Sequence, residues 1–478
     1  MIRIDRGGAI STARELLADV VDRDLCIGCG ACAALPGSAL RIGMGEDGRY
    51  RAALRDGADP ETEGPYVEVC PFADGHDEDE LARIFLDAPG ADRDPAIGTH
   101  LSVGAGHVTG DGFRDAGSSG GMTSWFLNRL FEEDEIDAVL HVKPGESPTD
   151  PLFGFGVSET VGQMRSGAKT RYYPVEMSGV LRHVRERPGR YAVVGVPCFI
   201  KAVRLSQLAD PLLAERIKFC VGLVCGHLKS ARFAESLAWE QGVPPAELTG
   251  VDFRVKSDER SDRYSVTVDA ADGTARTTPT SELSVTDWGM GFFKYTACDY
   301  CDDVLAETAD ITFGDAWLPE FTGDPKGDNI VVTRSRAAKD VVDRNSGALQ
   351  LTDISAERAA RSQDAGLRHR REGLAYRLAR ELQAGRRVQR KRVEPSTDLP
   401  ERRRRIYDIR TDLIATGDAA FTHAVRTGSF DDFLRGIGTD VARYRAAYGA
   451  DGPVERLKRL ALARAPGLTR RVQRALGR

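Results

Sequence analysis

The sequence of 478 residues predicts an α/β fold, in which a mixed α+β core lies between a cysteine-bearing N-terminal module and a basic helical tail. The segment MTSWFLNRLFEE has apolar residues at 122, 125, 126 and 130, the spacing of a helix with one buried face. The runs IDAVLHV, YAVVGVPC, KFCVGLVCG and ADITFGDAW indicate buried strands, with turn residues close by. Beyond residue 337 the composition becomes rich in Arg, Ala and Leu, which predicts helices.

These changes in composition predict the domain organisation. Within the core, YSVTVDAADGTARTT is typical of a hairpin that turns at Asp272-Gly273. We expect a cysteine module over 1–75, a Gly-, Asp- and Pro-rich connector over 76–111, an α/β core over 112–336 and a tail over 337–478.

The N-terminus, MIRIDRGGAI, lacks the apolar region of a signal peptide, and no apolar run reaches the roughly 18 residues of a transmembrane segment. The nine cysteines include close C-x2-C spacings, which favour metal ligands or redox centres over disulfides in such a chain. We therefore expect a cytoplasmic protein.

The net charge of −6 is unevenly distributed. Residues 341–478 carry 30 Lys and Arg against 17 Asp and Glu, a balance of +13, so the rest of the chain carries −19. Such a tail can dock on the acidic body, on another protein or on an anionic surface. A set of helices with a solvated arginine face is the alternative.

Three cysteines stand at three-residue steps in DRDLCIGCGACAALPG, residues 22–37. Bacterial ferredoxins continue such a run with three residues, a fourth Cys and a Pro, but here Pro36 occupies the fourth position. The segment VEVCPF supplies a Cys-Pro pair at 70–71, and residues 33–69 would loop out as an insertion. A zinc site, which usually takes two separated C-x2-C pairs, and unliganded cysteines are the alternatives. The spacing predicts a ferredoxin-like [4Fe–4S] cluster held by Cys26, Cys29, Cys32 and Cys70.

A second set of cysteines lies in the core. Two follow apolar runs, at the carboxyl ends of strands where open α/β sheets bind ligands, and two form a C-x2-C pair in TACDYCDD. Cys220 lies inside its apolar run and is expected to be a small core residue. A zinc site, or a redox pair of the two cysteines of CDYC, is the alternative to a second cluster. The four candidate ligands are Cys198, Cys225, Cys298 and Cys301.

Three further segments suggest an anionic ligand. AGSSGGMTSWF places glycines before a helix, where free N–H groups can bind a phosphate, although a serine cap with a flexible turn is an alternative. MRSGAKTRYYPVE can hold a pyrophosphate or a reduced flavin ring, or it is a solvated loop. FGDAW is a ligand contact or a turn. The candidates are Ser118, Ser119, Gly120, Gly121, Lys169, Arg171, Gly314 and Asp315.

In collinear order from about residue 22 to 336, these segments resemble the beta subunits of coenzyme F420-reducing hydrogenase and dehydrogenase. The matching features are the four first-set cysteines with Pro71 and the segments SSGG, KTRYYP, GVPC, GLVC, CDYC, ADITFGD and GDNIVVTRS. The basic tail is not explained by this resemblance.

The resemblance implies a flavoprotein that uses FAD and one or more [4Fe–4S] clusters to pass electrons to or from a two-electron carrier such as a deazaflavin. It implies that residues 118–121 line the flavin, that Lys169 and Arg171 face its phosphates or ring, and that the second cysteine set binds a cluster. A redox partner protein or ferredoxin would exchange the electrons. A non-catalytic electron-relay protein within a larger complex and a ferredoxin-dependent reductase of an organic acceptor are the alternatives, and no side chain is assignable as a catalytic acid or base.

Overall fold

The computed structural model describes residues 11–147 and 149–449, which form two compact units. The first unit holds the described residues through Thr286 together with Phe293–Thr397. The second holds Asp287–Phe292 and the described residues from Asp398 onward. Residues 337–397, the first part of the basic tail, thus belong to the same unit as the core.

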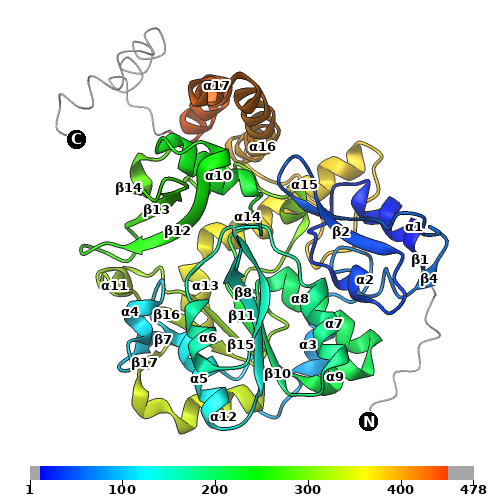
Figure 1. Cartoon of the computed structure of the whole chain (residues 1–478), viewed down its shortest axis with the longest axis vertical. Coiled ribbons are helices and arrows are strands. Elements are labelled where there is room, and N and C mark those ends of the chain that lie inside the picture. Colours follow the sequence, from blue (N-terminus) through cyan, green and yellow to red (C-terminus); the bar gives the residue numbers. More distant parts are fainter. Residues whose placement is uncertain (1–10, 148, 450–478) are drawn as a thin grey trace. The chain divides into compact units, whose positions relative to one another are not determined.

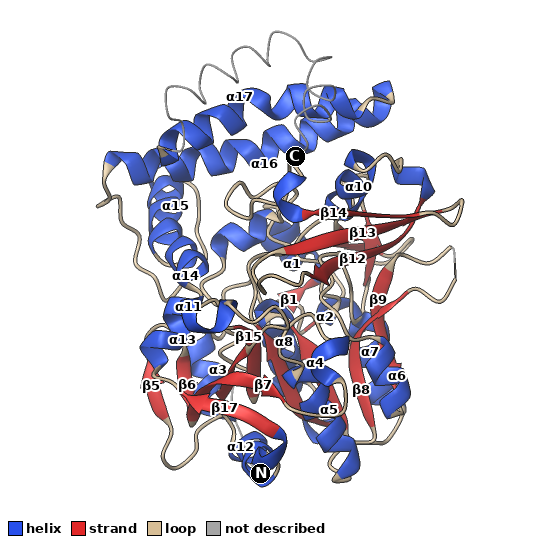
Figure 2. Cartoon of the chain, turned by 90° about the vertical axis from the view of Figure 1, so that its left-hand side faces the viewer, coloured by secondary structure: helices blue, strands red, loops and turns tan. Residues whose placement is uncertain are grey.

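A mixed sheet of eight strands forms the centre of the first unit (Figures 1 and 2), in the order β17-β7-β16-β15-β11-β10-β8-β9. Four neighbours, β15, β11, β10 and β8, are parallel, and the remaining pairs are antiparallel. The four parallel strands are the four apolar runs of the sequence, so the prediction of a mixed α/β core is confirmed. The strands are β7 (Ser102–Val108), β8 (Ala138–Pro144), β9 (Phe153–Ser158), β10 (Tyr191–Gly195), β11 (Ile217–Leu223), β15 (Ile311–Asp315), β16 (Asn329–Thr333) and β17 (Leu349–Asp353).

Helices cover both faces of this sheet. Along β10, Ala192 and Val194 belong to a core with α5 and α12, whereas Tyr191 and Val193 belong to a core with α7, α8 and α9. This alternation is the period of two that a strand buried on both faces requires. The helices are α5 (Met122–Glu132), α7 (Ser178–Glu186), α8 (Pro197–Ala209), α9 (Pro211–Arg216) and α12 (Arg336–Arg344).

The N-terminal cysteine region shares the core of α8. Leu16, Val20 and Leu25 lie in one continuous hydrophobic cluster with Phe199 and Ile200, and Figure 1 shows α2 beside α7 and α8. The expected insertion does not simply loop out, because β2 and β3 pair as an antiparallel hairpin within it. The elements are β1 (Ser11–Thr12), α1 (Ala13–Leu16), η1 (Leu17–Val21), α2 (Ala31–Ala34), β2 (Leu40–Met44), β3 (Tyr50–Leu54) and β4 (Glu63–Gly64).

A separate three-stranded sheet follows α10 and contains the predicted hairpin. β13 and β14 pair antiparallel around Asp272-Gly273, and Gly273 has a φ of +81°. Its strands are β12 (Leu248–Lys256), β13 (Tyr264–Ala270) and β14 (Ala275–Pro279). The smaller elements of the unit are α3 (Glu78–Phe85), β5 (Asp92–Asp94), β6 (Gly98–His100), α4 (Phe113–Ala116), α6 (Val161–Ser166), α10 (Ala231–Glu240), η2 (Pro245–Glu247), η3 (Thr280–Glu282), η4 (Thr296–Tyr300) and α11 (Pro319–Thr322).

The described part of the basic tail begins within α12 and is mostly helical, apart from β17 and a stretch without helix over 384–400. β17 pairs with β7 at one edge of the main sheet, after η5 (Ser346–Ala348), and α13 (Ala356–Ser362), α14 (Asp364–Arg370) and α15 (Glu372–Gln383) follow. In the second unit, α16 (Glu401–Thr427) packs along α17 (Phe430–Tyr448) through aromatic rings that include Phe421 and Phe433 (Figure 2). Residues 450–478 of the predicted tail lie outside the described residues. No helix in the described part of the chain has the length and apolar character to cross a membrane.

Candidate functional site

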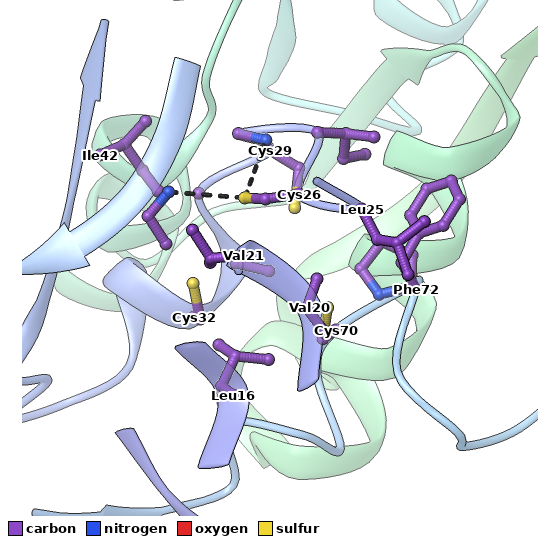
Figure 3. A pocket seen from close by; sticks show the side chains of 16 residues that line it. Leu16, Val20, Val21, Leu25, Cys26, Cys29, Cys32, Ile42, Cys70 and Phe72 are labelled. Atoms are coloured by element: carbon purple, nitrogen blue, oxygen red, sulfur yellow. Dashed lines mark hydrogen bonds between the residues drawn. The ribbon is translucent and has the colours of Figure 1, made fainter. Parts of the chain in front are cut away.

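The four cysteines of the first set line one pocket (Figure 3). Cys26 follows η1, Cys29 lies in the loop before α2, Cys32 lies within α2, and Cys70 comes from the loop before α3. Apolar side chains such as Val20, Leu25 and Phe72 form the rest of the wall. Apart from the four thiols, the residues that line the pocket have no polar side chain.

Backbone N–H groups point at the first-set sulfurs. The Sγ of Cys26 accepts hydrogen bonds from the N–H of Gly28 and of Ala52, both at 3.4 Å. Ala52 lies on β3, so the hairpin that was expected to loop out of the site returns to it instead. Such N–H···S bonds stabilise cluster thiolates and help to set the potential.

Burial and mutual repulsion keep these thiols protonated when no metal is bound. Burial raises the pKa of Cys70 to about 12 and raises the pKa of Cys29 and Cys32 further, and the neighbouring cysteines add to each increase. Four thiolates in one buried pocket therefore require a cationic metal centre to become stable together. The donor set and the N–H groups fit an iron–sulfur cluster.

The second set also comes together. The pKa of the Cys198 thiol is raised by burial and by the fields of Cys225, Cys301 and Cys298, and burial raises the pKa of Cys225 to about 12 and of Cys301 to about 11. Leu228 donates its N–H to the Sγ of Cys298 at 3.3 Å. Four buried thiols in one neighbourhood thus fit a second cluster by their chemistry.

One cysteine lies on a different element from the one expected. β10 ends at Gly195, and Cys198 is in the first turn of α8 rather than at the end of the strand. Pro197 explains this boundary, because its fixed φ favours the first position of a helix. Cys225 does follow the end of β11, and Cys220 is fully buried in the sheet core, where it was expected.

The two cysteine sets are neighbours. Pro71 and Phe72, which follow Cys70, line a pocket together with Cys198 and Cys301. In addition, the field of Cys29 contributes to the raised pKa of Cys198. Among residues 11–147 and 149–449, no three His, Cys, Asp or Glu side chains are arranged to hold a single metal ion.

A buried arginine from the tail lies among the second set, and sequence reasoning missed it. Arg370, the last residue of α14, donates to the carbonyl oxygens of Asp303 at 3.0 Å and Gly226 at 2.6 Å. Burial opposes its charge, but the fields of Cys301 and the other second-set thiols raise the pKa of its guanidinium. No local pattern distinguishes Arg370 from the other arginines of RHRREGL.

A second group of tail arginines, the arginine segment 386–392, pairs with acidic residues near both sets. Arg387 pairs with Asp19 and Asp74, and Arg390 pairs with Asp77 and Glu80. This part of the basic tail therefore docks on acidic residues of its own unit, one of the surfaces that the charge distribution allowed. The most buried member, Arg392, pairs with Glu78, Asp79, Asp302 and Glu307.

The glycine loop before α5 is held by contacts within the chain. Gly121 precedes the helix with a φ of +79°, and a Cβ there would lie 2.5 Å from the carbonyl carbon of Phe113. Ser119 Oγ donates to the Asp328 carbonyl at 3.0 Å, and Ser118 Oγ accepts the N–H of Thr170 at 3.0 Å. The residue that caps α5 is Gly121, and the N–H of Met122 is bound by the Oδ1 of Asn329 at 3.2 Å, so the alternative of a serine cap is wrong.

Cations surround this loop. Lys256, at the end of β12, donates its Nζ to the carbonyl oxygens of Ser119, at 3.1 Å, and Arg114. Burial and the cations of Arg114 and Lys169 lower the pKa of Lys256 to about 8. Lys169 pairs with Asp252 at 3.2 Å. An anion next to the loop would relieve this repulsion, and sequence reasoning missed Lys256 because a lysine at a strand end is ordinary.

The remaining candidate residues for the anionic ligand, Arg171, Gly314 and Asp315, already contact other residues of this chain. The Arg171 guanidinium lies over the ring of Phe153 at 4.7 Å, and its Nε–H has no acceptor in the described part of the chain. Asp315 accepts a hydrogen bond from Arg254 at 2.5 Å. A Cβ on Gly314 would overlap the side chain of Val224, so close packing beside Cys225 accounts for this glycine.

Two family models match the chain. The model of the N-terminal part of the coenzyme F420 hydrogenase/dehydrogenase beta subunit matches residues 103–182, and the model of its C-terminal part matches residues 189–357. The first cysteine set and Arg370 lie outside both matches. The matched regions nevertheless span more than half of the chain.

Two single proteins are also similar to this chain. One of the subunits of the F(420)H(2) dehydrogenase of Methanosarcina mazei is 26% identical over 320 residues, which cover 64% of this chain and 79% of the relative. A chain in a solved structure of the F420-reducing [NiFe] hydrogenase complex from Methanosarcina barkeri is 17% identical, with a TM-score of 0.48, over 62% of this chain and 98% of that chain. On the evidence of the two family models, the chain belongs to the family of coenzyme F420 hydrogenase/dehydrogenase beta subunits, which is a family of oxidoreductases.

Proposed function

We propose that this chain is an iron–sulfur flavoprotein that passes electrons between two [4Fe–4S] clusters and a two-electron carrier of the coenzyme F420 type through FAD. The observation that carries this proposal is the gathering of eight buried or half-buried cysteines into two neighbouring sets of four. Family membership supports the oxidoreductase class.

Cys26, Cys29, Cys32 and Cys70 would hold one cluster, and Cys198, Cys225, Cys298 and Cys301 would hold the other. Bound clusters would supply single electrons, and bound flavin would convert between one- and two-electron transfer. The chain itself buries the thiols, donates N–H groups to the sulfurs of Cys26 and Cys298, and places apolar walls around the first set.

For the flavin, we propose the glycine loop and the cations beside it. Lys256 and Lys169 lie next to the loop, and the field that lowers the pKa of Lys256 favours an anionic group there. Arg171 offers a buried N–H without an acceptor in the described residues. Residues 118–121 would bind the cofactor, and Gly314 and Asp315 would lie at its margin.

We also propose that the chain works in the cytoplasm beside a redox partner protein or ferredoxin. The names of its relatives support the presence of a partner protein, because one is part of a dehydrogenase and the other belongs to a hydrogenase complex. An electron relay without its own carrier reaction is the competing interpretation of the same names.

Anaerobic purification and reconstitution, with iron, sulfide and acid-released flavin measured per chain, test the proposal. We expect two clusters and one FAD, together with reduction of coenzyme F420 by a reduced viologen or ferredoxin. Two clusters without flavin would leave only the electron relay. Flavin and clusters with turnover of an organic acceptor but not of F420 would favour the ferredoxin-dependent reductase, and fewer than four iron atoms per chain would refute cluster binding altogether.

A further inference from the structure

We propose that Arg370 is the charge-compensating residue of the second cysteine set, and that it raises the reduction potential of the cluster bound there. The inference rests on the proposed second cluster. It goes beyond the family matches, which end at residue 357, and it assigns a specific role to one arginine of the basic tail.

The position of Arg370 is determined by two cysteine-bearing segments. Its two terminal nitrogens donate to the carbonyl oxygen of Gly226, the residue after Cys225, and to that of Asp303, two residues after Cys301. The side chain is 1% exposed. The guanidinium thus bridges the two backbone segments that carry these ligands. Because the group is planar and its donors are fixed relative to one another, these two hydrogen bonds determine its orientation.

The charge of Arg370 has no carboxylate partner. Within the described part of the chain it forms no ion pair with Asp or Glu, and its buried Nε–H has no acceptor. The two carbonyl oxygens that it binds belong instead to the segments that carry Cys225 and Cys301. Since a buried charge is stable only when it is compensated, the compensating anion is to be found at the cysteine set.

A thiolate-ligated [4Fe–4S] cluster meets this requirement. It carries net negative charge in both redox states and gains one further negative charge on reduction. A fixed cation beside it therefore stabilises the reduced form more than the oxidised form and raises the potential. A mononuclear zinc site would gain no comparable redox effect.

Arg334 provides a matched control. It is also fully buried, it also donates to two backbone carbonyl oxygens, those of Thr99 and Leu305, and its Nε–H also lacks an acceptor in the described residues. Burial lowers its pKa to about 10, and the groups that oppose this are Glu307 and Asp303 rather than cysteines. Arg334→Gln therefore removes a comparable buried guanidinium without removing a cation from the cysteine set.

The experiment is a redox titration of the full-length, anaerobically reconstituted protein, monitored by electron paramagnetic resonance, with iron counted per chain. In Arg370→Gln we expect the ratio of reduced to oxidised second cluster, measured at a fixed potential, to fall at least about tenfold. For a one-electron couple this corresponds to a midpoint potential about 59 mV lower. The first cluster should keep its midpoint, and both clusters should keep theirs in Arg334→Gln. Equal shifts in the two variants, or no shift in Arg370→Gln, would overturn the inference.

Two further outcomes are decisive. If Arg370→Gln loses the second cluster, the Arg370→Lys variant decides whether the charge is what matters. Two clusters, with a ratio of reduced to oxidised second cluster within tenfold of the wild-type ratio, support a role of charge. The same loss of iron in Arg370→Lys overturns the inference. If the wild-type protein itself holds iron for one cluster only, the proposed second cluster fails, and the inference fails with it. Wild-type protein with two clusters and an unshifted Arg370→Gln refutes the inference alone.

Discussion

Replacing Arg392 by glutamine should destabilise the first unit more than any other single change in the arginine segment 386–392. Arg392 is 10% exposed and lies within ion-pair distance of Glu78, Asp302 and Glu307, which are all buried, and of Asp79. Its backbone N–H also binds Asp302 at 3.1 Å. The substitution leaves buried carboxylates near one another without their shared cation.

The size of the effect follows from the partners that remain. Removing one member of a buried ion pair costs about 3–5 kcal/mol. Lys201 still pairs with Glu78 at 3.0 Å, and Arg371 still pairs with Glu307 at 3.1 Å, so we expect the lower end, about 3 kcal/mol. The first unit has about 390 residues, and an unfolding entropy of about 2.1 cal/mol/K per residue gives a decrease in Tm of about 4 °C.

Arg390→Gln is the control. Arg390 belongs to the same segment and also pairs with two carboxylates, but its side chain is 65% exposed, and exposed pairs contribute about 0.2–1 kcal/mol. We expect its Tm to fall by about 1 °C or less, and the difference to vanish at about 1 M salt, where the screening length is about 3 Å.

Calorimetry of both variants, at low and high salt and at equal iron content, provides the measurement. The larger decrease in Tm of Arg392→Gln should persist at high salt, because buried pairs are screened little. Equal decreases in the two variants, or a loss in Arg392→Gln that salt abolishes, would show that Arg392 acts as an ordinary surface charge.

Two further predictions concern the candidate sites. Cys70→Ser should lower the iron and sulfide content by about one cluster. Cys220→Ser, which changes a core cysteine away from both sets, should keep the full content. An unchanged iron count in Cys70→Ser would place the fourth ligand elsewhere. FAD affinity, measured by equilibrium dialysis, should fall about tenfold as the pH rises through about 8, where Lys256 loses its charge, and a wild-type pH profile in Lys256→Gln would refute this role. In the apo form, the pKa of Lys256 lies below its unfolded value of about 10.4, so the unfolded chain binds more protons between pH 8 and pH 10. The contribution of Lys256 to stability should therefore increase over this range, and the Tm of the wild type should rise relative to that of Lys256→Gln.

Local patterns were sufficient for the parallel strands and for the cysteine grouping. The four apolar runs are short, bounded by turn residues and buried on both faces, so their strand character is present in each segment by itself. The Cys-Pro pair at 70–71 could be placed beside the first three cysteines because the ferredoxin spacing left one specific gap. The prediction erred at Cys198 by extending β10 through Pro197, a residue that favours a helix start.

Long-range pairing left no comparable signal. Ala52 reaches Cys26 only because β2 and β3 fold back, and β17 joins β7 across more than two hundred residues. Arg370 and Arg392 stand in arginine-rich stretches that look the same as a solvated helix face, since nothing in the neighbouring residues reveals a buried carbonyl or carboxylate elsewhere in the chain. Burial of these arginines is a property of the tertiary fold alone.

The distribution of the cysteines along the chain determines when each site can be completed during synthesis. The first set lies within residues 26–70, so its ligands leave the ribosome early and close only short loops. The second set and Arg370 come from segments spread over residues 198–370, and they meet only after β10, β11 and β15 have formed their sheet and α14 has been made. The second set of cysteines is therefore completed late, and a chain that stops before residue 370 would bring the four thiols together without the guanidinium of Arg370 beside them.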